Sequence, residues 1–367
     1  MNAAQNLYQL GQSLWLDNIT RELLANGTLQ RYMNDFAVTG LTSNPTIFDH
    51  AIRETNSYDE AIQEKSSSGR SGEALFFDLA LEDLTQAADL FLPTHEASAG
   101  IDGWVSLEVS PLLAHDAAGT IREATHLHAR AQKKNLFIKI PGTLAGLTAI
   151  EESIFAGIPV NVTLLFSREQ YLAAADAYMR GIERRIAAGL DPRVGSVASI
   201  FVSRWDVAVK DKVPADLANR LGIAIAERTY CAYRELLVSP RWRKLRSAGA
   251  QEQRLLWAST GTKDPSASDT LYLQALAAPD TINTIPEKTL LAFVDHGKVS
   301  GSMPANGGDA EKVLAAFAQC GVDDAALATQ LQREGTESFS KSWSNLMAII
   351  AKKSENHVNA NSGAVRF

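Results

Sequence analysis

LFIKIPGT, at residues 136–143, is a short apolar run that contains one lysine and ends at Pro141-Gly142. A run of this length that stops at turn-forming residues is typical of a strand buried on both faces of a parallel sheet. Lysine is rarely buried without a reason, so Lys139 has two interpretations. Its amine reaches water or a carboxylate at the strand end, or it is a nucleophile, because burial leaves more free amine to attack a carbonyl carbon. Position alone favours the ordinary interpretation.

Seven further short apolar segments alternate with helix-like segments along the chain. They are centred near residues 15, 39, 106, 161, 199, 257 and 282. The intervening lengths are sufficient for helical crossovers, so eight β/α units in one chain predict a closed parallel barrel. The main alternative is a doubly wound open sheet, but no Gly-rich phosphate-binding turn follows the first segment.

We therefore predict an α/β fold, a (β/α)8 TIM barrel with additional N- and C-terminal helices. The length of 367 residues allows one or two domains, and barrels of this kind routinely form one domain of such size. We expect a single catalytic barrel domain over residues 1–367. The polar end of the chain, residues 355–367, is predicted to be a disordered tail.

The composition excludes several classes of protein. Hydrophobic residues make up 46% and charged residues 21%, which is typical of a soluble globular protein. The net charge of −7 disfavours nucleic acid and anionic membranes as partners, although a local cluster of cations could still bind a small anion. The basic segment 241–250 is interpreted as a solvated helix face. Neither Cys231 and Cys320 nor His126 and His128 are spaced as metal ligands. Without a secretory signal or an apolar run of about 18 residues, the cytoplasm is expected.

Polar side chains at the ends of the predicted strands are the candidates for an active site, because a β/α barrel builds its site at that face. In chain order they are Asp17, Asn44, Glu108, Lys139, Asn161, Thr163, Ser199, Arg204, Ser259 and Lys263. Each alone has a structural interpretation, such as a helix N-cap for Asp17, a turn for Asn44 or an ion pair for Arg204. A lysine and two carboxylates on one face instead predict proton transfer around an imine.

Seven motifs in order resemble transaldolase, in its longer bacterial subfamily, over about residues 10–350. They are WLD (15–17), TGLTSNPTIF (39–48), SLEVSP (106–111), IKIPGT (138–143), NVTLLFS (161–167), SIFVSR (199–204) and WASTGTK (257–263). The resemblance implies a (β/α)8 barrel that uses no metal and no organic cofactor. It also implies transfer of a dihydroxyacetone unit between sedoheptulose 7-phosphate and glyceraldehyde 3-phosphate, giving erythrose 4-phosphate and fructose 6-phosphate, in the non-oxidative pentose phosphate pathway.

The resemblance also implies catalytic roles. Lys139 would form the Schiff base, and Asp17 would take the hydroxyl proton during carbon–carbon cleavage. Glu108 would act through a water held by Thr163, moving protons as the carbinolamine forms and dehydrates. The protonated imine makes physical sense as an electron sink for the carbanion that cleavage leaves behind.

Six further side chains would bind the substrate by the same resemblance. Two amides would bind its hydroxyl groups, one serine would lie near the dihydroxyacetone end, and three side chains would hold the phosphate. In that order they are Asn44, Asn161, Ser199, Arg204, Ser259 and Lys263. Shorter members of the family have arginine near the place of Lys263, and lysine binds phosphate as a point charge rather than through a planar fork.

Two other functions are compatible with the same strands. One is a related lyase that cleaves fructose 6-phosphate to free dihydroxyacetone, against which chain length and Glu108 argue. The other is a non-catalytic barrel scaffold, which the presence of Asp17, Glu108 and Lys139 disfavours. The expected partners are sugar phosphates, with no nucleic acid and no membrane, and the sequence leaves a homo-oligomer open.

Overall fold

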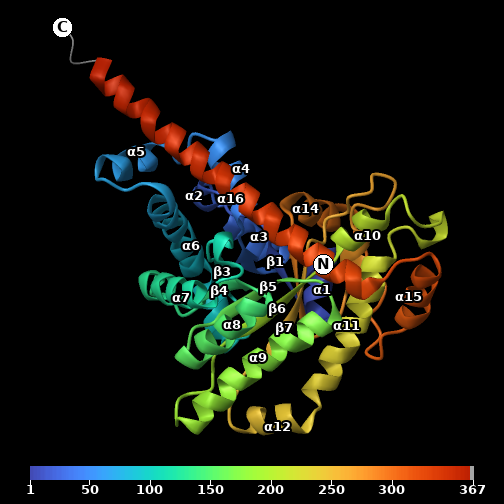
Figure 1. The fold of residues 1–367 in the computed structure, drawn as a ribbon. Coiled ribbons are helices and arrows are strands. Elements are labelled where there is room, and N and C mark those ends of the chain that lie inside the picture. The colour runs from blue at the N-terminus through green and yellow to red at the C-terminus, as the bar shows by residue number, and fades with distance from the viewer. Residues whose placement is uncertain (364–367) are drawn as a thin grey trace.

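Eight parallel strands close into a barrel in which each strand pairs with its neighbours in sequence and β1 pairs with β8 (Figure 1). The computed structural model describes residues 1–363. The strands are β1 (Gln12–Leu16), β2 (Val38–Thr42), β3 (Val105–Glu108), β4 (Leu136–Pro141), β5 (Val160–Leu165), β6 (Ser196–Phe201), β7 (Gln253–Ala258) and β8 (Thr281–Ile285). The predicted (β/α)8 barrel, with all eight strands, is confirmed.

Helices surround the barrel and extend it at both ends. They are α1 (Ala3–Gln9), α2 (Arg21–Ala25), α3 (Thr28–Phe36), α4 (Pro45–Glu54), α5 (Asp59–Ser67), α6 (Gly72–Ala97), α7 (Ala117–Ala131), α8 (Leu144–Ala156), α9 (Arg168–Ala187), α10 (Ser203–Val209), α11 (Leu221–Leu237), α12 (Pro240–Ser247), α13 (Leu271–Ala275), α14 (Glu287–His296), α15 (Ala310–Gln319) and α16 (Asp324–Gly363), with 3-10 turns at Pro111–Leu113 and Ala215–Leu217. None of the helices in the described part of the chain is both long and apolar enough to cross a lipid bilayer.

Two local expectations are answered by the structure. The sequence predicts one helix over 214–237, but α11 begins only at Leu221, because Asn219 adopts a left-handed backbone conformation with φ 59°. The basic segment 241–250 is helical in its first part, as interpreted, and Arg241 pairs there with carboxylates of α9.

The predicted tail lies partly beyond the described residues, in 364–367, and its disorder stays a prediction.

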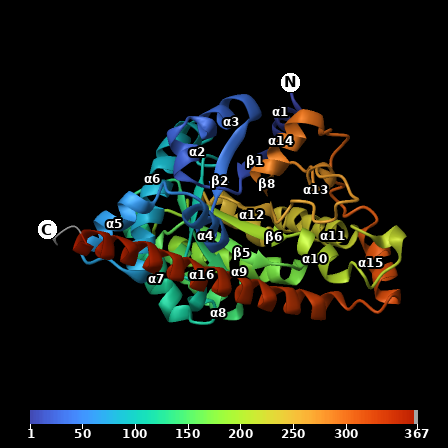
Figure 2. The same ribbon diagram turned by 90° about the horizontal axis from the view of Figure 1, so that it is seen from above.

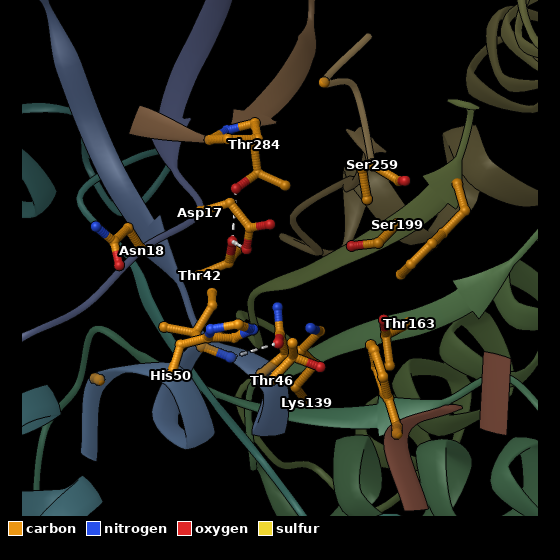
Figure 3. Close-up of a pocket in the computed structure, with 18 of the residues that line it drawn as sticks. Asp17, Asn18, Thr42, Thr46, His50, Lys139, Thr163, Ser199, Ser259 and Thr284 are labelled. Atoms are coloured by element: carbon orange, nitrogen blue, oxygen red, sulfur yellow. Dashed lines mark hydrogen bonds between the residues drawn. The ribbon is translucent and has the colours of Figure 1, made fainter. Parts of the chain in front are cut away.

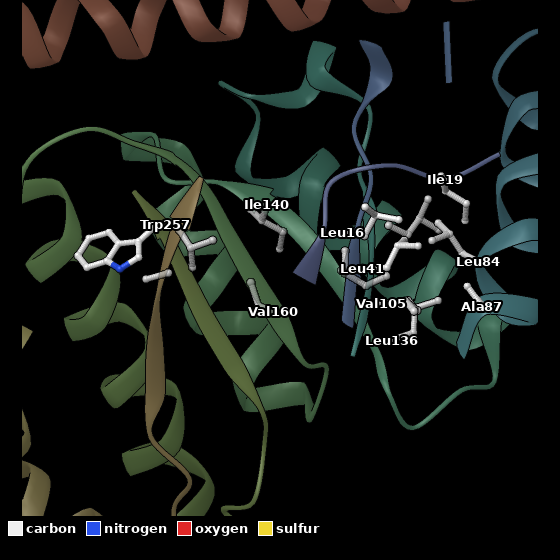
Figure 4. Packing of buried hydrophobic residues seen from close by; sticks show 14 of the residues in the cluster. Leu16, Ile19, Leu41, Leu84, Ala87, Val105, Leu136, Ile140, Val160 and Trp257 are labelled. Atoms are coloured by element: carbon white, nitrogen blue, oxygen red, sulfur yellow. The ribbon is translucent and has the colours of Figure 1, made fainter. Parts of the chain in front are cut away.

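The strand β4 shows how the barrel sorts its side chains. Leu136, Ile138 and Ile140 belong to the apolar cluster between the sheet and the surrounding helices (Figure 4). Phe137 belongs to the other cluster and stacks on Trp104 with ring centroids 3.9 Å apart. Since side chains alternate along a strand, Lys139 points to the same inner side as Phe137, one step closer to the C-terminal end.

The barrel interior also requires a glycine in β2. A Cβ added at Gly40 would lie 2.6 Å from Nε1 of Trp15, and that nitrogen donates a 2.7 Å hydrogen bond to the buried carboxylate of Asp102. We expect Gly40→Ala to lower the free energy of unfolding by about 1–3 kcal/mol, because the indole is held and cannot yield. Urea denaturation measures this loss. Gly301→Ala, at a site with open space around the glycine, is the control and should leave the midpoint unchanged.

The last helix lies across the C-terminal end of the barrel (Figures 1 and 2). Gln332 of α16 donates hydrogen bonds of 3.0 Å to the carbonyl oxygens of Gly142 and Leu164, at the ends of β4 and β5. Further along, the hydroxyl of Ser342 lies 2.8 Å from that of Thr46 in α4. The C-terminal end of the barrel is therefore covered by a segment that follows all eight strands in sequence.

Candidate active site

A cavity of about 540 Å³ opens at the C-terminal ends of the strands (Figure 3). Eight of the ten residues predicted from the sequence line it: Asp17, Asn44, Lys139, Thr163, Ser199, Arg204, Ser259 and Lys263. Glu108 and Asn161 do not line the cavity. Glu108 lies against the amine of Lys139, and Asn161 lies behind Ser199. The strands therefore bring all ten side chains to one end of the barrel.

Lys139 lies opposite Glu108 because β3 and β4 pair in register at these two residues. The Lys139 amine is 3.1 Å from Oε2 of Glu108 and donates a 3.1 Å hydrogen bond to the carbonyl oxygen of Ser43. Both side chains are buried, with exposed fractions of 6% and 3%. Burial raises the pKa of Glu108, while Lys139 opposes the rise and Asp17 adds to it. The carboxyl group at this site can therefore hold a proton more readily than a carboxyl group in water.

Asp17 follows β1 directly and faces the cavity from another side. Its Oδ1 accepts a 2.8 Å hydrogen bond from the hydroxyl of Thr42, which also lies 2.6 Å from the hydroxyl of Thr284. Burial raises the pKa of Asp17, although Lys139, Thr42 and Lys263 oppose the rise. The structural interpretation of Asp17 as a helix N-cap does not hold, because Thr20 caps α2.

Asn44 has a structural task as well as a place in the cavity wall. Its Oδ1 accepts a 3.1 Å hydrogen bond from the backbone N–H of Ile47 and so caps α4. Because Pro45 follows it, Asn44 is expected to adopt an extended or a turn conformation, and it is extended, with φ −158° and ψ 167°. The cap uses only the carbonyl oxygen of the side chain, so the amide N–H2 group remains available to a bound molecule.

A hydrogen-bonded row of polar side chains crosses the barrel below the cavity. The hydroxyl of Ser199 donates to Oδ1 of Asn161 at 2.8 Å, and Nδ2 of Asn161 donates to the hydroxyl of Ser106 at 3.1 Å. Asn161 is fully buried. The hydroxyl of Thr163 is also buried but makes no hydrogen bond with the described residues. Ser199 is thus held in one orientation, whereas Thr163 keeps its hydrogen-bonding capacity.

The other end of the cavity is cationic. Arg204 and Lys263 both line it, and among the described side chains none forms an ion pair or a hydrogen bond with their charged groups. Burial lowers the pKa of Arg204, and Glu334 opposes this. Ser259, which lines the same cavity, has φ 55° and a hydroxyl 3.0 Å from that of Ser203. Uncommitted cations beside a hydroxyl group, in a chain of net charge −7, form a local site for an anion.

Sequence reasoning missed three kinds of contact. Thr42 is the last residue of β2 and Thr284 the last but one of β8, so a search for polar residues near the strand ends could have found them. The carbonyl of Ser43 carries no side-chain signal. Phe339 of α16 lines the cavity, yet nothing in its local sequence points to the barrel mouth. No group of three or more His, Cys, Asp and Glu side chains suited to a metal ion occurs within the described residues.

The arrangement has two chemical capacities. A buried amine between a carboxyl group and a carbonyl oxygen, with a second carboxyl group facing the same cavity, can attack a carbonyl carbon and exchange protons with the adduct. The uncommitted cations at the other end can hold an anionic group of the same molecule.

Comparisons with known proteins identify the family of the chain. A sequence model of the family "Transaldolase/Fructose-6-phosphate aldolase" matches residues 14–350. The chain is 43% identical over 355 residues to a transaldolase of Arthrobacter sp. strain FB24, covering 94% of this chain and 96% of that protein. It is 44% identical over 346 residues to a transaldolase of Renibacterium salmoninarum, covering 92% of each. With a transaldolase of Thiobacillus denitrificans it shares 42% identity over 358 residues, covering 95% of this chain and all of that protein. The chain belongs to the transaldolase/fructose-6-phosphate aldolase family.

Proposed function

We propose that this protein is a transaldolase that moves a dihydroxyacetone unit from sedoheptulose 7-phosphate to glyceraldehyde 3-phosphate through a Schiff base at Lys139. The observation that carries the proposal is the buried Lys139 amine, 3.1 Å from Glu108, in a cavity whose far end holds uncommitted cations. The family match and the names of the relatives support the same reaction. The pentose phosphate pathway follows from that reaction.

The proposed reaction begins with the Lys139 amine. It attacks the ketose carbonyl, and loss of water gives an iminium that draws electrons from the neighbouring carbon–carbon bond. Asp17 takes the proton of the hydroxyl group at the cleaved carbon, so the aldehyde leaves and an enamine of dihydroxyacetone stays on the lysine. Addition of the second aldehyde and hydrolysis of the new iminium reverse these steps. The covalent fragment predicts ping-pong kinetics.

Glu108 is proposed to move the protons of carbinolamine formation and dehydration. Its carboxyl group is adjacent to the amine, and its raised pKa favours proton exchange closer to neutral pH. The unpaired hydroxyl of Thr163 is suited to hold the water through which Glu108 would act. Both roles depend on a water between the two side chains.

The substrate is proposed to lie between the two ends of the cavity. Asn44 and Ser199 would bind its hydroxyl groups from the cavity wall. Asn161 would support Ser199 through the hydrogen bond between their side chains. A second group of residues would hold the phosphate. They are Arg204, Ser259 and Lys263. Sugar phosphates are thus the proposed partners and the cytoplasm the proposed compartment.

Borohydride trapping tests the proposal directly. The protein is incubated with fructose 6-phosphate, reduced with borohydride, digested and mapped by mass spectrometry. The expected result is one three-carbon adduct, on Lys139. The absence of an adduct, or an adduct on another lysine, would contradict the Schiff base proposed here.

The family name includes an aldolase, so the same preparation should also be tested for lyase activity. Fructose 6-phosphate is supplied alone or with erythrose 4-phosphate, and free dihydroxyacetone and sedoheptulose 7-phosphate are measured. We expect transfer to exceed net release of dihydroxyacetone. Release that proceeds equally fast without an acceptor would identify a lyase instead.

The acid side of the pH profile should reflect the raised pKa of Asp17. The ionised carboxylate is the form that accepts a proton, so kcat/KM should fall as the pH decreases through a value above the ordinary range of aspartate. The measurement is kcat/KM from pH 4 to pH 9 at constant ionic strength. Glu108→Gln, which leaves Asp17 in place, should keep this acid limb at reduced activity. A limb in the ordinary range of aspartate would contradict the role of Asp17.

A further inference from the structure

Phe339 of α16 contacts both ends of the cavity. The centre of its ring is 5.8 Å from the Lys139 amine and 5.8 Å from the guanidinium carbon of Arg204. The ring is 4% exposed and lines the cavity. Both cations lie over the ring, which is the geometry in which the negative face of an aromatic ring attracts a positive charge.

The helix around Phe339 is shaped for this close approach. Gln332 binds the ends of two strands through their carbonyl oxygens. One turn before Phe339, a Cβ added at Gly335 would lie 2.9 Å from a methyl group of Leu164 and 3.3 Å from Nη1 of Arg204. Glycine at this position therefore lets the helix backbone lie against the cationic end of the cavity.

Aromatic faces are the contacts that hold the guanidinium of Arg204. Its carbon lies 5.2 Å from the ring centre of Phe201 and 5.8 Å from that of Phe339. Glu334 acts on it through its charge but forms no ion pair with it among the described residues. Arginine on an aromatic face keeps its N–H donors directed to the side, where an anion can accept them. An ion pair would occupy those donors, whereas stacking leaves them available.

We infer that Phe339 is a positioning residue, which holds Arg204 for the phosphate and Lys139 for the carbonyl carbon and so sets the distance between the two ends of the substrate. The inference rests on the proposed function and adds to it a residue of the C-terminal helix. The iminium that forms at Lys139 carries a positive charge, so the face of the ring attracts this intermediate, whereas the enamine that cleavage leaves is neutral. Lys139 is also held by Glu108 and by the carbonyl oxygen of Ser43, whereas Arg204 lies on aromatic faces. The position of Arg204 should therefore depend more strongly on the ring.

Three variants separate the aromatic face from simple packing. Phe339→Leu keeps an apolar side chain but removes the ring, and Phe339→Tyr keeps the ring. Trp343→Phe removes the 2.9 Å hydrogen bond from Trp343 to Glu73, so it loosens α16 away from the cavity and serves as the control. Thermal denaturation of all three shows whether the helix remains folded.

The readout compares a substrate that has a phosphate with one that lacks it. Borohydride trapping on Lys139 is measured against the concentration of fructose 6-phosphate and of dihydroxyacetone. For Phe339→Leu, we expect the concentration of fructose 6-phosphate that gives half-maximal trapping to rise about tenfold. The corresponding concentration of dihydroxyacetone should change less than about threefold. Phe339→Tyr and Trp343→Phe should remain within about twofold of the wild type for both ligands. Gly335→Ala places a methyl group against Leu164 and the guanidinium of Arg204, so it should displace that guanidinium and resemble Phe339→Leu.

The outcomes keep the two proposals distinct. If the wild type forms no adduct, the Schiff-base function fails. If the wild type forms the adduct and Phe339→Leu has unchanged half-saturation by fructose 6-phosphate, the role of Phe339 fails and the function stands. A third result would also overturn the inference. If Phe339→Leu and Phe339→Tyr both weaken half-saturation equally for fructose 6-phosphate and dihydroxyacetone, the ring serves packing alone.

Discussion

Lys139→Ala is expected to lower kcat/KM for transfer by at least about four orders of magnitude, because no other described amine lies in the same position to form the covalent adduct. The loss should appear in kcat, since the substrate can still be held by its phosphate. The measurement is the rate of erythrose 4-phosphate formation from sedoheptulose 7-phosphate and glyceraldehyde 3-phosphate. Borohydride trapping should fail in the same variant.

The controls for this variant address the buried charge it removes. Lys139→Arg keeps a cation beside Glu108, but a guanidinium stays protonated and is no nucleophile, so this variant should be equally inactive. Lys134→Ala removes an exposed lysine that pairs with Glu96 on the surface and should leave transfer unchanged. Substantial transfer by Lys139→Ala in a folded protein would exclude the Schiff base at this residue.

Asp17→Asn is expected to lower kcat by about 10²–10⁴-fold, the usual contribution of a positioned acid or base. Asparagine has nearly the same shape, and its oxygen can still accept the hydrogen bond from Thr42. Formation of the first adduct should persist, whereas cleavage of the carbon–carbon bond slows. Rapid-quench trapping should therefore find the intact ketose on Lys139 rather than the three-carbon fragment.

The same substitution should not destabilise the fold. The pKa of Asp17 is raised in the folded protein, so the ionised group is disfavoured there relative to the unfolded chain. Asparagine should therefore raise Tm at neutral pH. This gain should vanish as the pH falls below the pKa that the Asp17 carboxyl group has in the unfolded chain. Thr42→Val, which removes the donor to Asp17, serves as the matched control and should lower kcat far less. A kcat for Asp17→Asn near that of the wild type would contradict the assignment of Asp17 as the acid–base group.

Much of the barrel could be predicted because its units are local patterns. Each strand is a short, largely apolar run, and polar residues within it or just after it lie towards the end that the barrel directs to one face. The same logic identified Lys139, Asp17 and Glu108 as neighbours. The prediction of one helix over 214–237 was wrong at its start, because the left-handed conformation of Asn219 breaks it and the pattern of apolar residues does not report this.

The parts that could not be predicted depend on contacts between distant segments. Phe339 follows Lys139 by about 200 residues, and its place in the cavity results from hydrogen bonds of Gln332 to two strand ends. The pattern of α16 predicts a helix but gives no direction in which that helix crosses the barrel. Likewise, the task of Asn161 as a support for Ser199 follows from a partner that lies on another strand.

The sequence by itself determined the eight β/α units and the identity of the polar groups at the strand ends, because periodicity and local hydrogen bonding decide secondary structure within a few residues. Only the tertiary structure decided which of these groups meet. The register of β3 on β4 sets Glu108 against the Lys139 amine, and the packing of α16 leaves Arg204 on aromatic faces with its donors uncommitted. Such distances depend on how whole elements pack, and packing is a property of the assembled barrel rather than of any one segment.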